Sequence, residues 1–330
     1  MIETIEIALA ADGGYFCGLF VTACSIAEHA DADVELSYNI LDGGIAGNDW
    51  MLLEKKILEL HPKSRLRRIA VDEALFASYP KWNGNRMAYA RLILPAAMKD
   101  QDWVIYCDCD FLWMRDIAEL WDERDDERWL IGTPDQTPWA MALERDWFAQ
   151  NGFPFDEGKY FCSGLCMFNL KEFREQDLIT RCQEVMSLPG IHFPDQAALN
   201  VVAWGHVKLL LKSRWQCFTR ELTAEDLAAG TVIHYAGEIP WKFVKGIQIL
   251  SDSMLIWHQF NAKYRGVSLW RSLRMYFGIF ELVWHRGLCW LFRTPLLKEA
   301  LRFILAKIGH QGVYNMFAMR ARKFHVRYAV

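Results

Sequence analysis

Short apolar segments alternate with amphipathic ones through the first third of the chain, and this alternation most constrains the fold. Segments that run apolar and carry β-branched residues predict strands, and segments with apolar residues at helical spacing predict helices. Strand and helix in strict alternation favour an α/β fold with a mainly parallel central sheet and helices on its faces. The strands are expected at 5–10, 34–42, 65–72 and 103–111, and the helices at 16–30, 48–61 and 86–98.

After residue 115 predicted strands and helices no longer alternate regularly. We expect a short helix at 115–122, a strand with a loop at 129–136 and a strand running into a helix at 160–175. A further helix is expected at 194–204 and a late short strand at 231–237. From about residue 257 the pattern is helical. Interruptions are expected there at the residues that break helices, namely Gly266, Gly278, Gly287, Pro295 and Gly309.

Composition restricts the class of protein. Of the 330 residues, 52% are hydrophobic, which is enough for a large core and argues against disorder. The nine cysteines show no paired metal-ligand spacing, so we expect reduced thiols in a cytoplasmic protein. The N-terminus lacks the basic region of a signal peptide. No apolar run is long enough to predict a transmembrane helix.

Charge is divided unevenly along the chain. Residues 263–330 hold 13 Lys and Arg but two Asp and Glu, a net charge of +11, whereas the first 262 residues carry −15. Basic residues there are interleaved with Trp, Phe, Leu and Ile, which is typical of helices that lie in a membrane interface. The alternative is a helical subdomain that packs its aromatic residues against the body. Charge alone would also suit nucleic acid, but nothing else in the sequence indicates it, and we expect no nucleic-acid partner.

Two acids, Asp108 and Asp110, stand in the apolar segment that ends at Phe111. Residues i and i+2 of a strand project to the same side, and ligands bind at the carboxyl ends of strands in open α/β sheets. Two neighbouring carboxylates repel unless a cation lies between them, and oxygen ligands suit Mn²⁺ or Mg²⁺. One alternative is that the two acids only lie at a solvated strand end. Another is that the protein is a phosphatase of the haloacid dehalogenase type, although Phe111 and Leu112 do not fit the motif of that class.

Five short motifs surround these acids in a fixed order. They are "ADGGY" from Ala11, "YARL" from Tyr89, "SGLCMFNL" from Ser163, "DQAALN" from Asp195 and "HYAGEIPW" from His234. Together they resemble the retaining glycosyltransferases of family eight, especially bacterial lipopolysaccharide galactosyl- and glucosyltransferases, over roughly residues 5–242. The resemblance implies a GT-A type catalytic domain at 1–256, with a nucleotide half at about 1–115 and a sugar and acceptor half at about 116–256. A helical basic segment follows at 257–330.

The resemblance also implies roles for single residues. Ala10 and Asp12 would meet the uracil of a UDP-sugar, and Tyr15 would stack on it. Arg91 would neutralise the donor. The metal ligands would be Asp108, Asp110 and His234.

Further residues would contact the diphosphate and the sugar. Gly237 would let the backbone approach the diphosphate, and Lys242 would reach it. On the sugar side the resemblance places Ser163, Gly164, Asp195, which would grip sugar hydroxyls, and Gln196, which would face the anomeric carbon.

Four positions depart from the family pattern: Gly14 and Cys162, where the family often has Asn, Ala197, where it often has Asp, and Ile239, where it usually has Lys. These departures keep open a non-catalytic UDP-sugar-binding protein as an alternative.

The expected activity is a metal-dependent transfer of galactose or glucose from a UDP-hexose to a hydroxyl group, with retention of the anomeric configuration. The acceptor is expected to be a glycan or a lipid-linked molecule, with the protein attached peripherally to the inner face of the membrane through residues 263–330. Gln196 is a poor nucleophile, so we expect attack by the acceptor on the face from which the diphosphate leaves. The sequence does not choose between galactose and glucose.

Overall fold

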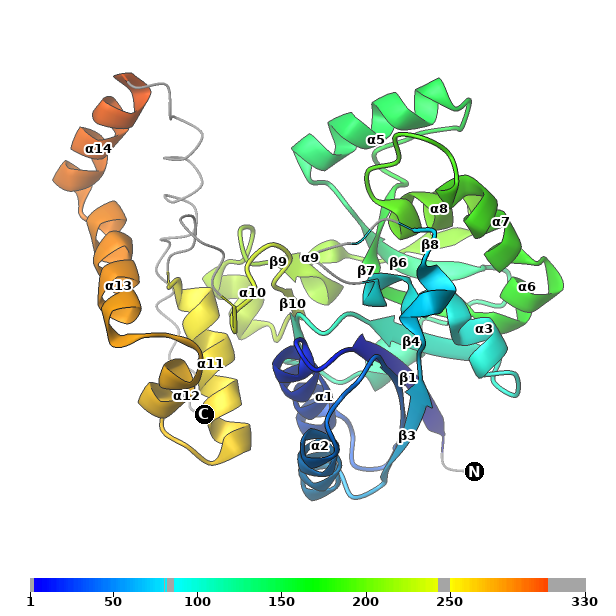
Figure 1. Cartoon of the computed structure of the whole chain (residues 1–330), viewed down its shortest axis with the longest axis horizontal. Helices are drawn as coiled ribbons and strands as arrows, with labels where there is room; N and C mark the ends of the chain where they lie inside the picture. Colours follow the sequence, from blue (N-terminus) through cyan, green and yellow to red (C-terminus); the bar gives the residue numbers. More distant parts are fainter. Residues whose placement is uncertain (1–2, 80, 82–85, 243–249, 308–330) are drawn as a thin grey trace. The chain divides into compact units, whose positions relative to one another are not determined.

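The computed structural model describes residues 3–79, 81, 86–242 and 250–307 (Figure 1). The chain divides into two compact units. Of the described residues, those within 1–109 and 115–216 form the first unit, and those within 110–114 and 217–307 form the second. The domain boundaries expected from the sequence, at about 115 and 256, stay predictions.

A seven-stranded sheet forms the centre of the first unit, in the order β3-β2-β1-β4-β7-β6-β8. Strand β7 is antiparallel to both β4 and β6, and the other neighbouring strands are parallel. The predicted mixed, mostly parallel sheet is confirmed. Its strands are β1 (Thr4–Ala11), β2 (Glu35–Asp42), β3 (Ser64–Ala70), β4 (Trp103–Cys107), β6 (Leu130–Pro134), β7 (Phe161–Asn169) and β8 (Val207–Leu209).

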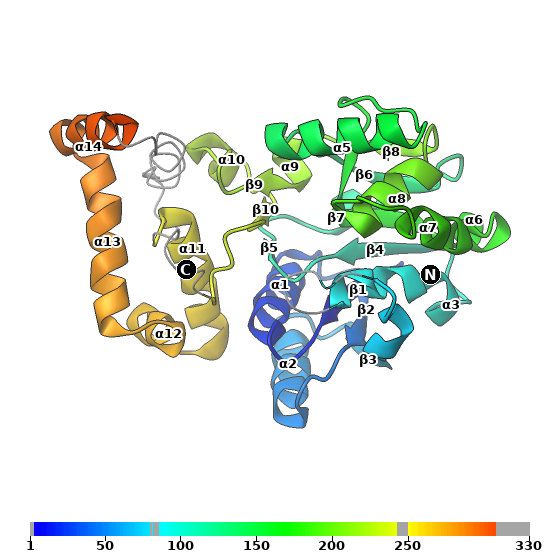
Figure 2. The same cartoon turned by 45° about the horizontal axis from the view of Figure 1, so that its top comes forward.

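Helices cover both faces of this sheet. Right-handed crossovers place α1 (Phe16–His29) and α2 (Gly47–Leu60) on one face, because β1, β2 and β3 advance in one direction. The return from β3 to β4 brings the 3₁₀ helix η2 and α3 to the other face, where α6, α7 and α8 follow side by side (Figure 2). The remaining bounds are η1 (Glu73–Phe76), η2 (Met87–Ile93), α3 (Leu94–Ala97), α4 (Ala118–Trp121), α5 (Pro138–Gln150), α6 (Leu170–Glu175), α7 (Leu178–Met186), α8 (Pro194–Val202) and α9 (Lys212–Trp215).

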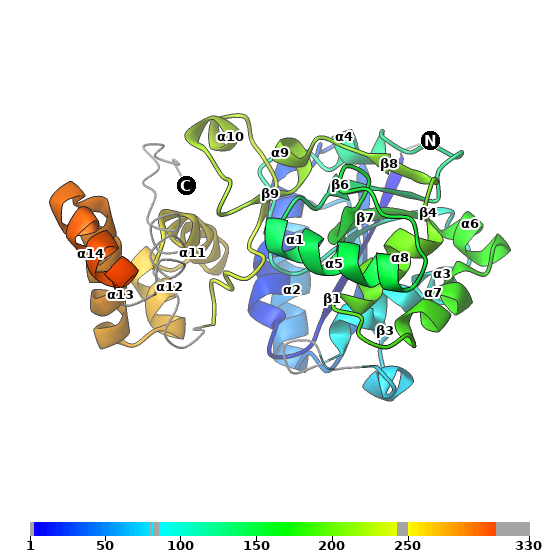
Figure 3. The ribbon, with the colours of Figure 1, turned by 90° about the horizontal axis from the view of Figure 1, so that it is seen from above.

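The second unit contains a small sheet, β5-β10-β9, and helices. Its strands are β5 (Phe111–Leu112), β9 (Cys217–Phe218) and β10 (Ile233–His234). Helices α11 and α12 lie side by side (Figure 3). The helices are α10 (Ala224–Ala228), α11 (Asp252–Arg265), α12 (Leu269–Tyr276), α13 (Ile279–Arg293) and α14 (Pro295–Lys307). Within the described residues no helix has the length and apolar character needed to cross a bilayer.

Three predicted local features are wrong. Strand β4 ends at Cys107, so Asp108 and Asp110 follow the strand instead of lying in it. Residues 86–98 form a 3₁₀ helix followed by one α-helical turn. Pro95 has no N–H that could donate to the carbonyl of Arg91, so this carbonyl accepts from the backbone N–H of Leu94 instead. Helix α13 continues through Gly287, since a single glycine costs a helix only about 1 kcal/mol. The expected interruption at Gly309 lies outside the described residues.

Candidate active site

Three acidic residues follow three strands that end at the same edge of the large sheet. Asp12 follows β1, Asp108 follows β4 and Asp135 follows β6. Strands β1 and β4 are parallel, with Leu9 opposite Cys107, and β4 and β6 are parallel because both are antiparallel to β7. This carboxyl edge is where α/β sheets bind ligands.

Arg91 contacts Asp108 at this edge and is almost fully buried. Its Nη2 atom donates to Asp108 Oδ1 over 2.8 Å, and its Nε atom lies 3.3 Å from Asp195 Oδ2. Its Nη1 atom donates to the carbonyl of Ser163. Burial alone would lower the pKa of the guanidinium, but the neighbouring acids, Asp108 foremost, raise this pKa well above its ordinary value. Arg91 is therefore a fixed buried cation that joins three predicted site residues.

Asp108 has contacts besides Arg91. The Tyr106 hydroxyl donates to Asp108 Oδ1 over 2.8 Å, and the backbone N–H of Asp108 donates to the carbonyl of Gly164, also over 2.8 Å. The ring of Tyr106 lies under the Arg91 guanidinium, 4.5 Å from its centroid to Cζ. These contacts fix the carboxylate, which stays partly exposed.

The residues predicted for the sugar side lie beside Arg91. The backbone N–H of Ser163 donates to Gln196 Oε1 over 3.0 Å, and its hydroxyl lies 3.4 Å from Asp195 Oδ2. Helix α8 begins at Pro194, so Asp195 and Gln196 occupy its first turn. The start of β7 and the start of α8 thus bring together Ser163, Gly164, Asp195 and Gln196, to which the sequence analysis assigns contacts with the sugar.

Three polar residues that were not predicted from the sequence extend this cluster. Gln196 Nε2 donates to Asp135 Oδ2 over 3.2 Å and to the Tyr160 hydroxyl oxygen over 3.4 Å. The Tyr160 hydroxyl donates to Glu144 Oε2 over 2.7 Å. Asp135 could have been suspected, because it follows an apolar strand just as Asp108 does. Glu144 and Tyr160 carry no comparable signal.

The predicted nucleotide residues lie at the end of β1. The carbonyl of Ala10 accepts from the Cys109 thiol over 3.0 Å, which joins the end of β1 to the residue after Asp108. Asp12 Oδ1 accepts from the backbone N–H of Tyr15 over 2.9 Å, and this turn leads into α1. A side chain at Gly14 would meet Asp12 Oδ1 at 3.3 Å, so replacing this glycine would shift the Asp12 carboxylate.

The other two predicted metal ligands meet in the second unit. Strands β5 and β10 pair His234 with Phe111, and the backbone N–H of Tyr235 donates to the carbonyl of Asp110. His234 is buried and stacks on the Phe111 ring, with centroids 4.0 Å apart. Its Nε2 atom lies 3.3 Å from Asp110 Oδ1.

This pair fits a divalent cation. Asp110 Oδ1 is buried and makes no hydrogen bond to the described residues, because the contact with His234 is not aligned as one. Adjacent ligands of an octahedral ion lie about 3 Å apart when each is about 2.1 Å from the metal. An imidazole nitrogen and a carboxylate oxygen are suitable ligands for Mn²⁺. Within the described parts of the chain, however, no three acidic, His or Cys side chains are gathered as a complete metal site.

The last two predicted donor contacts also belong to the second unit. Gly237 is exposed just after β10, with φ +74°, a conformation that glycine adopts easily. Lys242 is exposed, and its backbone N–H donates to the carbonyl of Ile239.

Cys162 and Ala197, two of the departures from the family pattern, are buried in the first unit. Burial raises the pKa of the Cys162 thiol well above its ordinary value, so this side chain is a neutral thiol.

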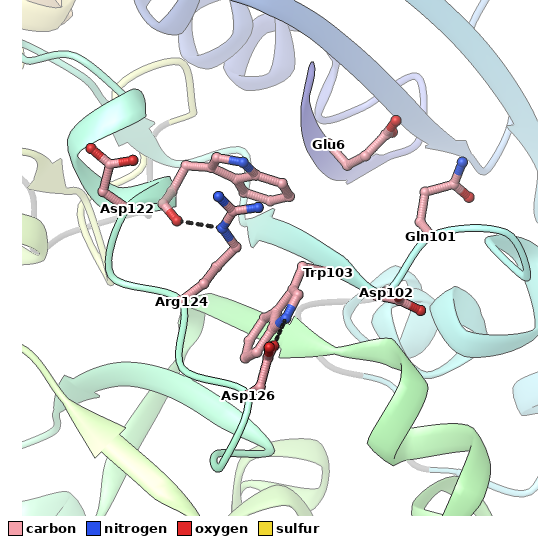
Figure 4. Close-up of a pocket in the computed structure, with 8 residues that line it drawn as sticks. Glu6, Gln101, Asp102, Trp103, Asp122, Arg124 and Asp126 are labelled. Atoms are coloured by element: carbon pink, nitrogen blue, oxygen red, sulfur yellow. Dashed lines mark hydrogen bonds between the residues drawn. The ribbon is translucent and has the colours of Figure 1, made fainter. Parts of the chain in front are cut away.

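A pocket of about 560 Å³ lies elsewhere on the first unit (Figure 4). It is lined by residues near the beginning of β4, including Asp102 and Trp103, and by Trp121 and Arg124. Since β4 ends at Cys107, this pocket lies at the sheet edge opposite Asp108. It contains none of the predicted site residues.

Comparison with known proteins decides the family. The sequence matches the profile of Glycosyl transferase family 8 over residues 6–244. The chain belongs to glycosyltransferase family 8. General stress protein A of Bacillus subtilis (strain 168) is 25% identical over 270 residues, which cover 72% of this chain and 88% of that protein.

Solved structures show the same fold. The galactosyltransferase LgtC, in complex with donor and acceptor sugar analogs, is 24% identical, with a TM-score of 0.64 and coverage of 80% of this chain and 96% of that chain. The bifunctional glycosyltransferase WbbM is 19% identical, with a TM-score of 0.63 and coverage of 79% of this chain. The match spans half the length of WbbM. The GT-A fold predicted from the sequence is confirmed, and the comparisons do not support the haloacid dehalogenase alternative.

Proposed function

We propose that this family 8 glycosyltransferase transfers a hexose, galactose or glucose, from a UDP-sugar to a hydroxyl group, with retention of anomeric configuration and dependence on a divalent metal. The single observation that carries the proposal is Arg91. Its guanidinium contacts Asp108, predicted to bind the metal, and Asp195, predicted to bind the sugar. A buried cation in contact with both groups is suited to a donor whose diphosphate is anionic and whose sugar is attached directly to it.

The proposed metal ligands are Asp108, Asp110 and His234, with Mn²⁺ or Mg²⁺ as the ion. Only Cys109 separates the two acids, so the chain keeps their Cα atoms within about 7 Å. The bound ion would neutralise charge on the diphosphate as it leaves.

The residues of the chain have distinct proposed roles. Ala10, Asp12 and Tyr15 bind the uracil, and Gly237 and Lys242 contact the diphosphate. Asp195 holds sugar hydroxyls. The pairing with Arg91 keeps the Asp195 carboxylate a poor nucleophile, and the Gln196 amide is a poor nucleophile as well. These features support attack by the acceptor hydroxyl on the same face, with its proton passing to the departing phosphate. Trapping a glycosylated side chain by mass spectrometry would contradict this route.

The experiment that tests the function is a donor panel. Purified protein is incubated with UDP-galactose, UDP-glucose and other UDP-hexoses, with Mn²⁺ or with chelator, and released UDP is measured. Metal-dependent release from one hexose donor supports the proposal, and products from a truncated lipid-linked glycan, identified by mass, would establish the acceptor. Thermal stabilisation by UDP without turnover of any donor would instead favour the non-catalytic binder.

We also propose that the C-terminal helices attach the protein to a membrane surface. Exposed apolar side chains gather in α12, α13 and α14 (orange in Figure 1), namely Trp270, Met275, Ile279, Phe280, Val283, Trp284, Trp290, Leu296, Leu297 and Phe303. On α13 the helical period places Phe280, Val283 and Trp284 on one side. An exposed apolar helix side flanked by basic residues suits a lipid interface.

Some of the basic side chains of the described C-terminal helices are paired with an acid. Arg286 and Arg293 both pair with Asp252, at 3.5 and 2.7 Å, so these charges are partly neutralised within the second unit. Arg271 and Arg274 on α12 are exposed and adjoin Trp270 and Met275. Among the described residues, α12 therefore offers exposed basic side chains that can attract anionic lipids, next to the exposed apolar side chains of the same helix.

A further inference from the structure

Glu144 is a buried carboxyl group that no proposed step of sugar transfer uses. It lies on α5 with none of its surface exposed, and its only hydrogen bond among the described residues comes from the Tyr160 hydroxyl at 2.7 Å. Its other oxygen, Oε1, is buried without a hydrogen-bond partner in the described part of the chain. A buried carboxyl that is only half satisfied costs stability, so its presence calls for an explanation.

The contacts of Tyr160 lead from Glu144 to Gln196. Because the Tyr160 proton is donated to Glu144, the phenolic oxygen can only accept from its other neighbour. That neighbour is Gln196 Nε2, at 3.4 Å. Glu144 thereby dictates that the nitrogen of the Gln196 amide, and not its oxygen, faces Tyr160.

Two further contacts agree with this orientation. Asp135 Oδ2 accepts from Gln196 Nε2 over 3.2 Å, and the backbone N–H of Ser163 donates to Gln196 Oε1 over 3.0 Å. Asp135 is itself held, because its Oδ1 atom accepts from the backbone N–H of Thr137 at the start of α5. The amide is thus fixed from three sides, by β7, by the loop after β6 and by the Tyr160 hydroxyl.

We propose that Glu144 is a positioning residue for the transfer reaction, which through the Tyr160 hydroxyl fixes the Gln196 amide with Oε1 toward Ser163 and Nε2 toward Asp135. The expected effect on turnover rests on the proposed function, whereas the expected orientation of the Gln196 amide does not. A flipped or mobile amide would present the wrong dipole beside the sugar, and misplacement of a group by about 1 Å can cost about 100-fold in rate.

The protonation state of Glu144 affects the strength of this arrangement. Burial raises the pKa of Glu144 to about 7, although the hydrogen bond from Tyr160 opposes the rise, and nearby Asp135 and Asp195 raise it further. Tyr160, Asp135 and Asp195 are the titratable groups that act on this carboxyl. The ionised form is the stronger acceptor for the Tyr160 proton, so the orientation should tighten as Glu144 loses its proton.

Turnover provides the first test. UDP release is measured for the full-length protein and for Glu144→Leu, Glu144→Gln and Tyr160→Phe, with Asp146→Asn on the exposed side of the same helix as the control. We expect kcat to fall about tenfold or more in Glu144→Leu and Tyr160→Phe, while the affinity for UDP changes less than about twofold. Glu144→Gln should retain part of the original kcat. In a protein that already carries Gln196→Ala, Tyr160→Phe should not lower kcat further, because Gln196 transmits the effect of Tyr160 on turnover. Additive losses, or unchanged kcat, would overturn the inference.

A second test does not depend on turnover. In ¹⁵N-glutamine-labelled protein, the Gln196 side-chain amide signals are assigned by their absence in Gln196→Ala. We expect these signals to titrate near pH 7 in the unmodified chain, to stop titrating in Glu144→Gln, and to move in Tyr160→Phe. Unaltered Gln196 signals in these variants would overturn it. If no UDP-hexose were turned over, the proposed function would fail while these signals still decided the role of Glu144.

Discussion

The Arg91 guanidinium donates a hydrogen bond to Asp108, with 2.8 Å between Nη2 and Oδ1. Arg91 comes from the 3₁₀ helix η2 and Asp108 from the end of β4. The same guanidinium also holds Asp195 at the start of α8. One buried cation therefore organises two acids that are proposed to bind different parts of the donor.

Replacing Arg91 should abolish most of the activity. Arg91→Ala would leave Asp108 and Asp195 without their shared cation, and we expect UDP release to fall by about 100-fold or more. Arg91→Lys keeps the charge but loses the planar set of donors, so its activity should remain at least about tenfold low. The control is Arg181→Lys on α7, an exposed arginine. Activity in Arg91→Lys equal to that of the control would contradict the role of this residue.

Stability should depend on pH through Glu144. The pKa of its carboxyl is about 7 when folded and near 4.5 ordinarily, so the folded state binds more protons between these values. The free energy of unfolding should therefore decrease as pH rises from about 4.5 to about 7, by up to about 3 kcal/mol.

Glu144→Gln cannot ionise and should lack this decrease. Urea unfolding of both proteins at about pH 5 and about pH 8 measures it. Relative to the unmodified chain, the glutamine variant should gain stability at the higher pH. Equal pH dependence in the two proteins would show that Glu144 does not titrate as described.

Membrane attachment should depend on the exposed side of α13. A Phe280→Ser, Trp284→Ser double variant loses two large apolar contacts, each worth about 1.5–3 kcal/mol when fully buried. We expect binding to vesicles containing anionic lipid to fall at least about tenfold, while the fold and UDP release stay unchanged.

The matched control replaces two exposed apolar residues of α2, as Met51→Ser, Leu58→Ser. This variant should sediment with vesicles as the unmodified protein does. Equal vesicle binding by all three proteins, or none by the unmodified protein, would contradict the membrane proposal.

Much of the site could be predicted from the sequence, because its residues stand in short motifs beside apolar strands. The alternating pattern before residue 111 predicted β1 to β4 and the edge at which they end. The motifs predicted Arg91, Asp195 and Gln196, which the structure brings together in the first unit.

What the sequence did not reveal depends on contacts between distant segments. Asp135 reaches Gln196 because β6 runs parallel to β4 through the antiparallel β7, a topology that no local pattern contains. The sequence carries no local signal for Glu144, and the burial of this residue follows from how α5 packs. The 3₁₀ helix η2 has a local cause instead, because a pattern of helical spacing does not take into account that Pro95 lacks an N–H.

The most direct test of the central claim is the affinity for UDP with and without metal, measured by calorimetry on the full chain. We expect excess chelator to weaken UDP binding at least about tenfold relative to Mn²⁺, and the double variant Asp108→Ala, Asp110→Ala to lack this difference. Equal UDP affinity in Mn²⁺ and in chelator, or a double variant that keeps the metal effect, would contradict the claim that these two acids hold the metal for the donor.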